Sequence, residues 1–285
     1  MQHVAVPPNR APAGARQSGA LRSAPPPVGA SSRHAPPAAV AGPPAASDGA
    51  LVATEALAPL TFGEGFRVGV VGDTRCGKTE ALKRLIEEYQ RRSPGPVFIA
   101  DTKERMPQFA GQYRRDKADL ERHPPDPAVG RVIVFRGDHA DVAGGQFDPE
   151  QIAEIQHELA TRYRMPSLGV YDELDLACEW GQLRAKPSTI RWCFKQGGSS
   201  GVSVLWGTQE TVDIPAPIFN QSSMILSFRM VGAPVRLLGK RGYLEGGAAE
   251  TIETLPGEEL PPAQRGYFVA LRRGRPWDGE TWRFR

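Results

Sequence analysis

An eight-residue loop between an apolar, β-branched run and an amphipathic segment most constrains how this chain can fold. Residues 72–79 read Gly-Asp-Thr-Arg-Cys-Gly-Lys-Thr and match the phosphate-binding pattern G-x-x-x-x-G-K-[ST] at every fixed position. Glycines let successive backbone N–H groups point at a phosphate, and the positive end of the following helix reinforces them. Residues 81–89 repeat apolar side chains at the three- and four-residue spacing of such a helix. The chain is therefore predicted to bind a nucleoside triphosphate.

The loop residues have distinct predicted roles. Lys78 would neutralise the β- and γ-phosphates, and the Thr79 hydroxyl would help to hold Mg²⁺. Cys76 is interpreted as an inert filler that an oxidant or alkylating agent could still reach. The positions expected to surround the nucleotide are Gly72, Asp73, Thr74, Arg75, Cys76, Gly77, Lys78 and Thr79.

Residues 1–58 differ in composition from the rest of the chain. They contain no Phe, Tyr or Trp and are dominated by Ala and Pro, so they cannot bury enough apolar surface to fold. We predict a disordered tail over 1–58 and one α/β domain over 59–285. With no long apolar run, no secretory signal and three cysteines without metal-like spacing, the chain is expected in the cytoplasm without a transmembrane segment. The formal charge of +3 identifies no polyanionic partner.

Predicted strands alternate with predicted helices along the domain, which indicates a mostly parallel sheet covered by helices on both faces. The ends of several strands carry polar side chains that can serve a ligand at one sheet edge, namely Asp101, Asp172, Gln209 and Arg229. The strands are predicted at 66–71, 97–101, 131–135, 167–173, 202–207 and 224–228, the helices at 78–92, 105–122, 149–164 and 187–196, and a closing hairpin at 266–272 and 280–285.

The Asp172-Glu173 pair follows an apolar strand and is the second candidate element of the site. Asp172 would hold Mg²⁺ directly or through water, next to Thr79. Glu173 faces differently and would polarise the water that attacks the γ-phosphate. Gln209, at the end of the next strand, would sense the γ-phosphate or hold that water. These residues predict hydrolysis of the nucleotide.

Three segments together resemble the FtsK/HerA superfamily of DNA-translocating ATPases: residues 72–79, the stretch Leu168–Leu176, and Gly201–Gln209. The likeness continues through Asp213-Ile214-Pro215 to Phe228-Arg229. It implies a RecA-like P-loop NTPase fold, ATP and Mg²⁺ as cofactors, and a hexameric ring that moves double-stranded DNA. The short chain is most similar to genome-packaging ATPases of membrane-containing viruses, which implies a capsid or membrane-vertex partner.

The chain departs from that family at two positions. Arg75 stands where the family usually has Gly, which adds a charge over the phosphates. Gly197-Gly198-Ser199-Ser200 stands where an arginine commonly acts on the neighbouring subunit's nucleotide. That arginine must come from elsewhere or be absent; Arg229 is favoured over Arg191 and Arg67.

Other classes of P-loop protein remain open. A small-molecule kinase needs no Asp-Glu pair aimed at water, and no Arg-rich lid is found. A plasmid or cellular DNA-transfer ATPase of the same superfamily fits the motifs equally, and so does an ATPase that never contacts DNA. A binding module with a dead site is disfavoured because each expected catalytic position is filled.

Overall fold

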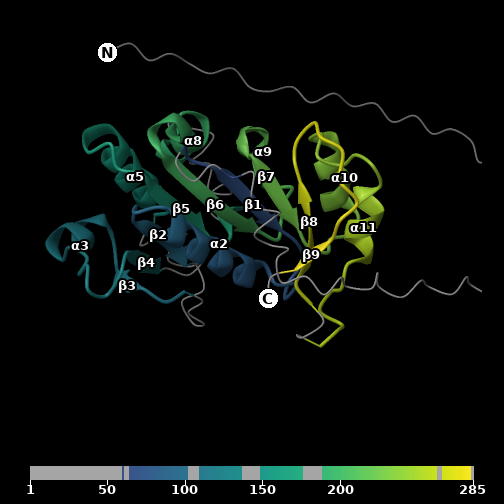
Figure 1. The fold of residues 1–285 in the computed structure, drawn as a ribbon, viewed down its shortest axis with the longest axis horizontal. Coiled ribbons are helices and arrows are strands. Elements are labelled where there is room, and N and C mark those ends of the chain that lie inside the picture. Colours follow the sequence, from purple (N-terminus) through teal and green to yellow (C-terminus); the bar gives the residue numbers. More distant parts are fainter. Residues whose placement is uncertain are drawn as a thin grey trace, which may run out of the picture. The chain divides into compact units, whose positions relative to one another are not determined.

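A computed structural model of the chain describes residues 60, 64–101, 109–136, 148–175, 188–261 and 265–283. Over these residues, nine strands form a sheet in the order β3-β4-β2-β5-β6-β1-β7-β8-β9 (Figure 1). The neighbours from β3 to β7 are parallel, whereas β7–β8 and β8–β9 are antiparallel. The strands are β1 (Arg67–Val71), β2 (Val97–Asp101), β3 (Gln112–Arg114), β4 (Val132–Arg136), β5 (Ser167–Tyr171), β6 (Val202–Thr208), β7 (Met224–Ser227), β8 (Tyr267–Leu271) and β9 (Trp282–Arg283). The predicted mostly parallel sheet with a closing hairpin is confirmed.

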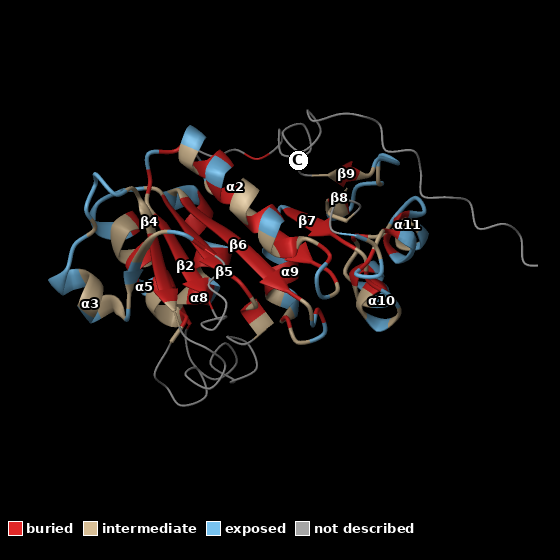
Figure 2. Ribbon diagram, turned by 90° about the horizontal axis from the view of Figure 1, so that it is seen from below, coloured by how far each residue is buried: buried red, intermediate tan, exposed pale blue. Residues whose placement is uncertain are grey.

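Helices cover both faces of the sheet, as predicted (Figure 2). Helix α2 buries its apolar stripe against one face, together with the alternate β1 residues Val68 and Val70. The other face packs against α5, α8 and α9, and near the C-terminal strands against α10 and α11. The helices are α2 (Lys78–Arg92), α3 (Lys117–Arg122), α5 (Glu150–Arg162), α8 (Thr189–Lys195), the 3₁₀ turn η1 (Gly197–Ser200), α9 (Ala216–Gln221), α10 (Ala233–Lys240) and α11 (Ala248–Thr254).

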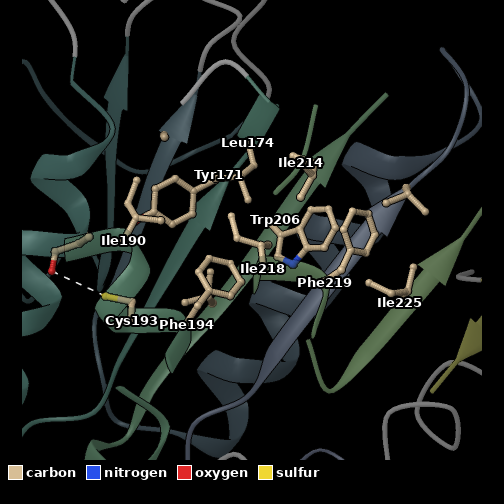
Figure 3. Packing of buried hydrophobic residues seen from close by; sticks show 14 of the residues in the cluster. Tyr171, Leu174, Ile190, Cys193, Phe194, Trp206, Ile214, Ile218, Phe219 and Ile225 are labelled. Carbon is tan, nitrogen blue, oxygen red and sulfur yellow. Dashed lines mark hydrogen bonds between the residues drawn. The ribbon is translucent and has the colours of Figure 1, made fainter. Parts of the chain in front are cut away.

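The position of β1 at the middle of the sheet depends on one glycine. A Cβ on Gly69 would lie 2.4 Å from the Trp206 ring, so only glycine lets that ring lie across β1. Trp206 is fully buried, donates from Nε1 to the Ser222 hydroxyl at 3.1 Å, and meets Phe219 edge to face (Figure 3). This packing holds the strand that carries the phosphate-binding loop.

The predicted helix over Arg105–Arg122 is wrong in its central part. Residues 112–114 form the edge strand β3, helix α3 begins only at Lys117, and residues 105–108 lie outside the described residues. The Gln112 side chain binds the 126–130 turn, donating to the Asp126 and Gly130 carbonyls and accepting from the Asp126 amide, each at 2.8 Å. These long-range contacts override the helical preference of a polar segment.

The remaining predicted elements agree within about two residues, and the helices α9, α10 and α11 were not predicted. At the start of α5 the Asp148 side chain accepts from the Glu150 amide at 2.9 Å. The predicted tail over 1–58 lies outside the described residues, so this boundary stays a prediction. Within the described ranges, no helix is long and apolar enough to span a membrane.

Candidate nucleotide-binding site

The loop between β1 and α2 runs against the end of β7. The Asp73 amide donates to the Arg229 carbonyl at 2.9 Å, and the Phe228 amide donates to the Val71 carbonyl at 2.9 Å. Gly72 has φ 155°, and a Cβ there would lie 2.6 Å from Phe228. Gly77 has φ 112°, in the left-handed region, and immediately precedes α2 as its N-cap residue. The backbone of the loop is therefore fixed by its neighbours and by conformations that only glycine adopts easily.

Lys78 lies inside this loop and is buried. Its Nζ donates to the Gly72 carbonyl at 2.8 Å and to the Asp73 carbonyl at 2.7 Å. An ammonium group held inside the phosphate-binding loop is well placed to bind a phosphate there. Cys76 beside it is 1 % exposed, and burial raises the pKa of its thiol. The expectation that a thiol reagent could reach Cys76 is therefore wrong.

Asp172 and Glu173 follow β5 at the same edge of the sheet. Asp172 is 2 % exposed, and its amide donates to the Ala100 carbonyl of β2 at 3.3 Å. A Cβ on Gly207 would lie 3.5 Å from Asp172 Oδ1, so the carboxylate lies between β5 and β6. A buried carboxylate fits Mg²⁺, which prefers oxygen ligands, and the Thr79 hydroxyl in the first turn of α2 offers another.

Glu173 is one of three non-glycine residues with positive φ among those the structure describes, at 69°. The left-handed conformation costs a non-glycine residue free energy, and such residues gather at functional sites where the surroundings impose them. Glu173 Oε1 accepts from Gln209 Nε2, whereas Asp172 Oδ1 lies next to Gly207 of β6. The two adjacent carboxylates thus have different neighbours, and the separate roles predicted for them stay predictions.

Gln209 joins the phosphate-binding loop to Glu173. Its Nε2 donates to Glu173 Oε1 at 2.8 Å, and its Oε1 accepts from the Thr74 hydroxyl at 2.5 Å. One amide thus contacts both the loop and the acid, and it fixes the orientation of each. Sequence alone placed Gln209 at this edge but did not predict the contact with Thr74.

The three candidate arginines lie in different surroundings. Arg229 pairs with Glu259 (NH1–Oε2 2.9 Å), and its carbonyl accepts from the loop. Arg67 lies at the opposite edge, where NH2 donates to the Cys193 carbonyl at 3.0 Å and burial lowers the pKa of the guanidinium. Arg191 is exposed on α8. The structure thus places only Arg229 of these three beside the loop of its own chain.

The acidic turn around Glu259 is the functional candidate that sequence reasoning missed. It lies 30 residues from Arg229, and no motif or periodicity links the two. The one sequence signal is a pair of acids after Pro256-Gly257, which by itself indicates a solvated turn.

The central parallel sheet with a phosphate-binding loop after β1 defines the P-loop NTPase class. No protein-family model matches the chain, and no curated protein matches it by sequence. Solved structures do match. The genome packaging NTPase B204 from Sulfolobus turreted icosahedral virus 2, in complex with ATP-gammaS, is 15 % identical with a TM-score of 0.51, over 75 % of this chain and 98 % of that one.

Two further structures are similar at the same level. The DNA-packaging ATPase B204 from Sulfolobus Turreted Icosahedral Virus is 15 % identical with a TM-score of 0.51, over 74 % of this chain and 93 % of that one. VirB4 of Thermoanaerobacter pseudethanolicus is 12 % identical with a TM-score of 0.51, over 75 % and 90 %. The resemblance to FtsK/HerA ATPases, with viral packaging proteins among the similar structures, is confirmed at the level of the fold.

Proposed function

We propose that the chain hydrolyses ATP and uses the energy to move double-stranded DNA, packaging a viral genome into a preformed capsid. The observation that carries the hydrolytic part is the hydrogen-bonded series Thr74–Gln209–Glu173, which ties a candidate base to the phosphate-binding loop. A small-molecule kinase would direct such an acid at its acceptor and needs no Asp-Glu pair aimed at water. The packaging part rests on the fold shared with B204, whose structures bear the names genome packaging NTPase and DNA-packaging ATPase.

In the proposed mechanism each residue has one task. Lys78 turns from the loop carbonyls to the phosphates and neutralises charge there. Glu173 accepts a proton from the attacking water, and Gln209 holds both the carboxylate and the loop in place. Thr79 and Asp172 would hold Mg²⁺, and the bound ion would supply positive charge that stabilises negative charge on the phosphates.

The proposed assembly is a homo-oligomeric ring around the DNA, a hexamer as the family resemblance implies. Its further partner would be a capsid or membrane-vertex protein. The same site would also serve a DNA-transfer ATPase, so the genome-packaging role is separated from that one by its partner and not by its chemistry.

Hydrolysis is tested first with Lys78→Ala and Glu173→Gln. The lysine change should weaken ATP binding, because Lys78 contacts the phosphates in the ground state. Glu173→Gln keeps the oxygen that accepts from Gln209, so binding should persist while kcat falls about a hundredfold or more. Equal loss of binding in both variants contradicts Glu173 as the base. Glu210→Gln, an exposed acid next to Gln209, is the matched control and should leave both quantities unchanged.

The DNA partner is tested with the same preparation. Duplex DNA should stimulate phosphate release in the absence of any other acceptor, and the stimulation should vanish in Glu173→Gln. Hydrolysis that no DNA stimulates favours an ATPase acting on another partner. Transfer of phosphate to an added small molecule, without release to water, identifies a kinase.

A further inference from the structure

Arg229 is anchored at the phosphate-binding loop of its own chain. The backbone after β7 continues beside β1, so that the Arg229 carbonyl accepts from the Asp73 amide at 2.9 Å. This contact uses main-chain atoms, so any residue at position 229 keeps it. The Cα of Arg229 is therefore held beside the phosphate-binding loop, independently of any contact that its guanidinium makes.

The guanidinium end is held by a second, separate structure. NH1 lies 2.9 Å from Glu259 Oε2, and Glu259 Oε1 accepts from the Gly257 amide at 3.0 Å. A Cβ on Gly257 would lie 2.2 Å from Arg229 NH1, so the guanidinium lies directly on the Gly257 backbone. Hydrogen bonds from the backbone amides of Glu259 and Gly257, together with the charge of Arg229, lower the pKa of the Glu259 carboxyl.

The turn that carries Glu259 is itself braced. The Arg265 guanidinium donates to the Leu260 and Glu258 carbonyls, and the Leu260 amide donates to the Gly257 carbonyl at 3.3 Å. A carboxylate held by its own turn can orient a long, otherwise mobile side chain. Orientation of this kind removes conformational freedom before the ligand binds.

The charges around Asp73 also indicate that Arg229 lies near the phosphate-binding loop of its own chain. Burial raises the pKa of the Asp73 carboxyl, Arg229 and Lys78 lower it, and Glu258 and Glu259 raise it further. Arg229 therefore lies within electrostatic range of Asp73 of the same chain, and Lys78 acts on that same carboxyl. Its side chain is 31 % exposed, so a phosphate oxygen can approach it.

From this geometry we propose that Arg229 acts on the nucleotide bound by its own chain, and that Glu259 is the residue that positions its guanidinium. The inference deepens the proposed ATP hydrolysis and rests on it. The planar guanidinium would hydrogen-bond phosphate oxygens and stabilise the charge that develops during transfer. It replaces the expectation that Arg229 reaches a neighbouring subunit's nucleotide with action within one chain.

Single variants test the positioning. Arg229→Ala should lower kcat on the order of a hundredfold, the usual effect of losing one charge-stabilising donor. Glu259→Gln keeps the bond from the Gly257 amide but loses the charge, and should lower kcat about two- to five-fold with KM little changed. Glu258→Gln, the adjacent acid, is the matched control and should match wild type. Thermal melting of each variant checks that it folds, and equal rates for the two Gln variants overturn the role of Glu259.

A charge swap separates positioning from mere stabilisation. Arg229→Glu combined with Glu259→Arg rebuilds the ion pair in reverse but puts an acid beside the phosphates. We expect the melting temperature to recover relative to Arg229→Glu alone, while hydrolysis stays as low as in Arg229→Ala. Recovery of the rate in the double variant shows that the pair only stabilises the fold, and the proposal then fails.

Mixed assemblies test action within one chain. Arg229→Ala and Lys78→Ala chains carry different tags, are co-expressed, and complexes with both tags are isolated. Each subunit then lacks one essential group, so hydrolysis should stay at the level of the single variants; recovered hydrolysis overturns the proposal. Wild-type hydrolysis at a concentration where light scattering detects only single chains also shows that one chain suffices, as proposed. Absence of hydrolysis by wild type refutes the proposed function instead, so the two failures are distinguishable.

Discussion

At the scale of single residues, the site depends on two sets of contacts between distant parts of the chain, Thr74–Gln209–Glu173 and Arg229–Glu259. The phosphate-binding loop, Asp172 and Glu173 could be named because each belongs to a local pattern beside an apolar strand. The left-handed backbone of Glu173 could not, because the turn after β5 imposes it against the preference of the residue. The contact of Arg229 with Glu259 likewise depends on the folded chain, which alone brings residues 30 positions apart together.

The buried thiols of Cys76 and Cys193 give a prediction at this scale. Burial raises both pKa values, that of Cys193 to about 12, so little thiolate exists at pH 8. In a Cys178→Ser variant, native protein should react with a disulfide reagent at roughly a hundredth or less of the rate seen in denaturant. Reactivity should increase with pH, since the raised pKa leaves the thiols protonated below it. Fast labelling of either native thiol at pH 8 contradicts the burial.

At the scale of elements, periodicity identified the long pieces and missed the short ones. Helix α2 was predicted with its observed bounds because fifteen residues repeat one apolar stripe. Helices α9 and α10 have six and eight residues and contain Pro217 and Pro234 in their first turns, so they resemble loops in sequence. Strand β3 has three residues and depends on a distant turn.

The contact between α5 and α8 allows a prediction of how much one side chain on α5 stabilises the start of α8. Glu150, at the start of α5, accepts from the Ser188 hydroxyl and, at 3.0 Å, from the Ile190 amide at the start of α8. Glu150→Ala leaves these buried donors unsatisfied and should lower the free energy of unfolding by about 1–3 kcal/mol. The exposed Glu154→Ala on the same helix should change it by less than about 0.5 kcal/mol. Urea unfolding measures both.

The contribution of the Glu150 carboxyl to the free energy of unfolding should depend on pH in a defined direction. Burial raises the pKa of the Glu150 carboxyl above its ordinary value, so the folded chain binds that proton more tightly than the unfolded chain. The resulting stabilisation is complete below the unfolded pKa and is lost as pH rises through the folded pKa. Relative to Glu150→Gln, the wild type should therefore lose stability from pH 4 to pH 7. A gain over that range contradicts the cause assigned here.

At the scale of the whole molecule, the predicted tail can be tested by removal. A chain lacking residues 1–55 should hydrolyse ATP at the wild-type rate and melt at the same temperature, because a segment without aromatics adds little core. The cut must spare Leu60, which is 6 % exposed and packs in the cluster with α2. A melting temperature lower by several degrees shows that the tail contacts the domain.

The order of strands in the sheet also has a consequence for how the protein is made. Strand β1 is translated before every other strand of the sheet, yet its neighbours are β6 and β7. The amide of Phe66, just before β1, donates to the hydroxyl of Ser203, which lies 137 residues further along the chain. At about 5–20 residues per second, a ribosome needs on the order of ten seconds to supply that partner. Until then β1 lacks its partner strands, and the phosphate-binding loop that follows it lacks the contacts that fix its conformation. Nearly the whole domain must therefore leave the ribosome before a nucleotide has anywhere to bind.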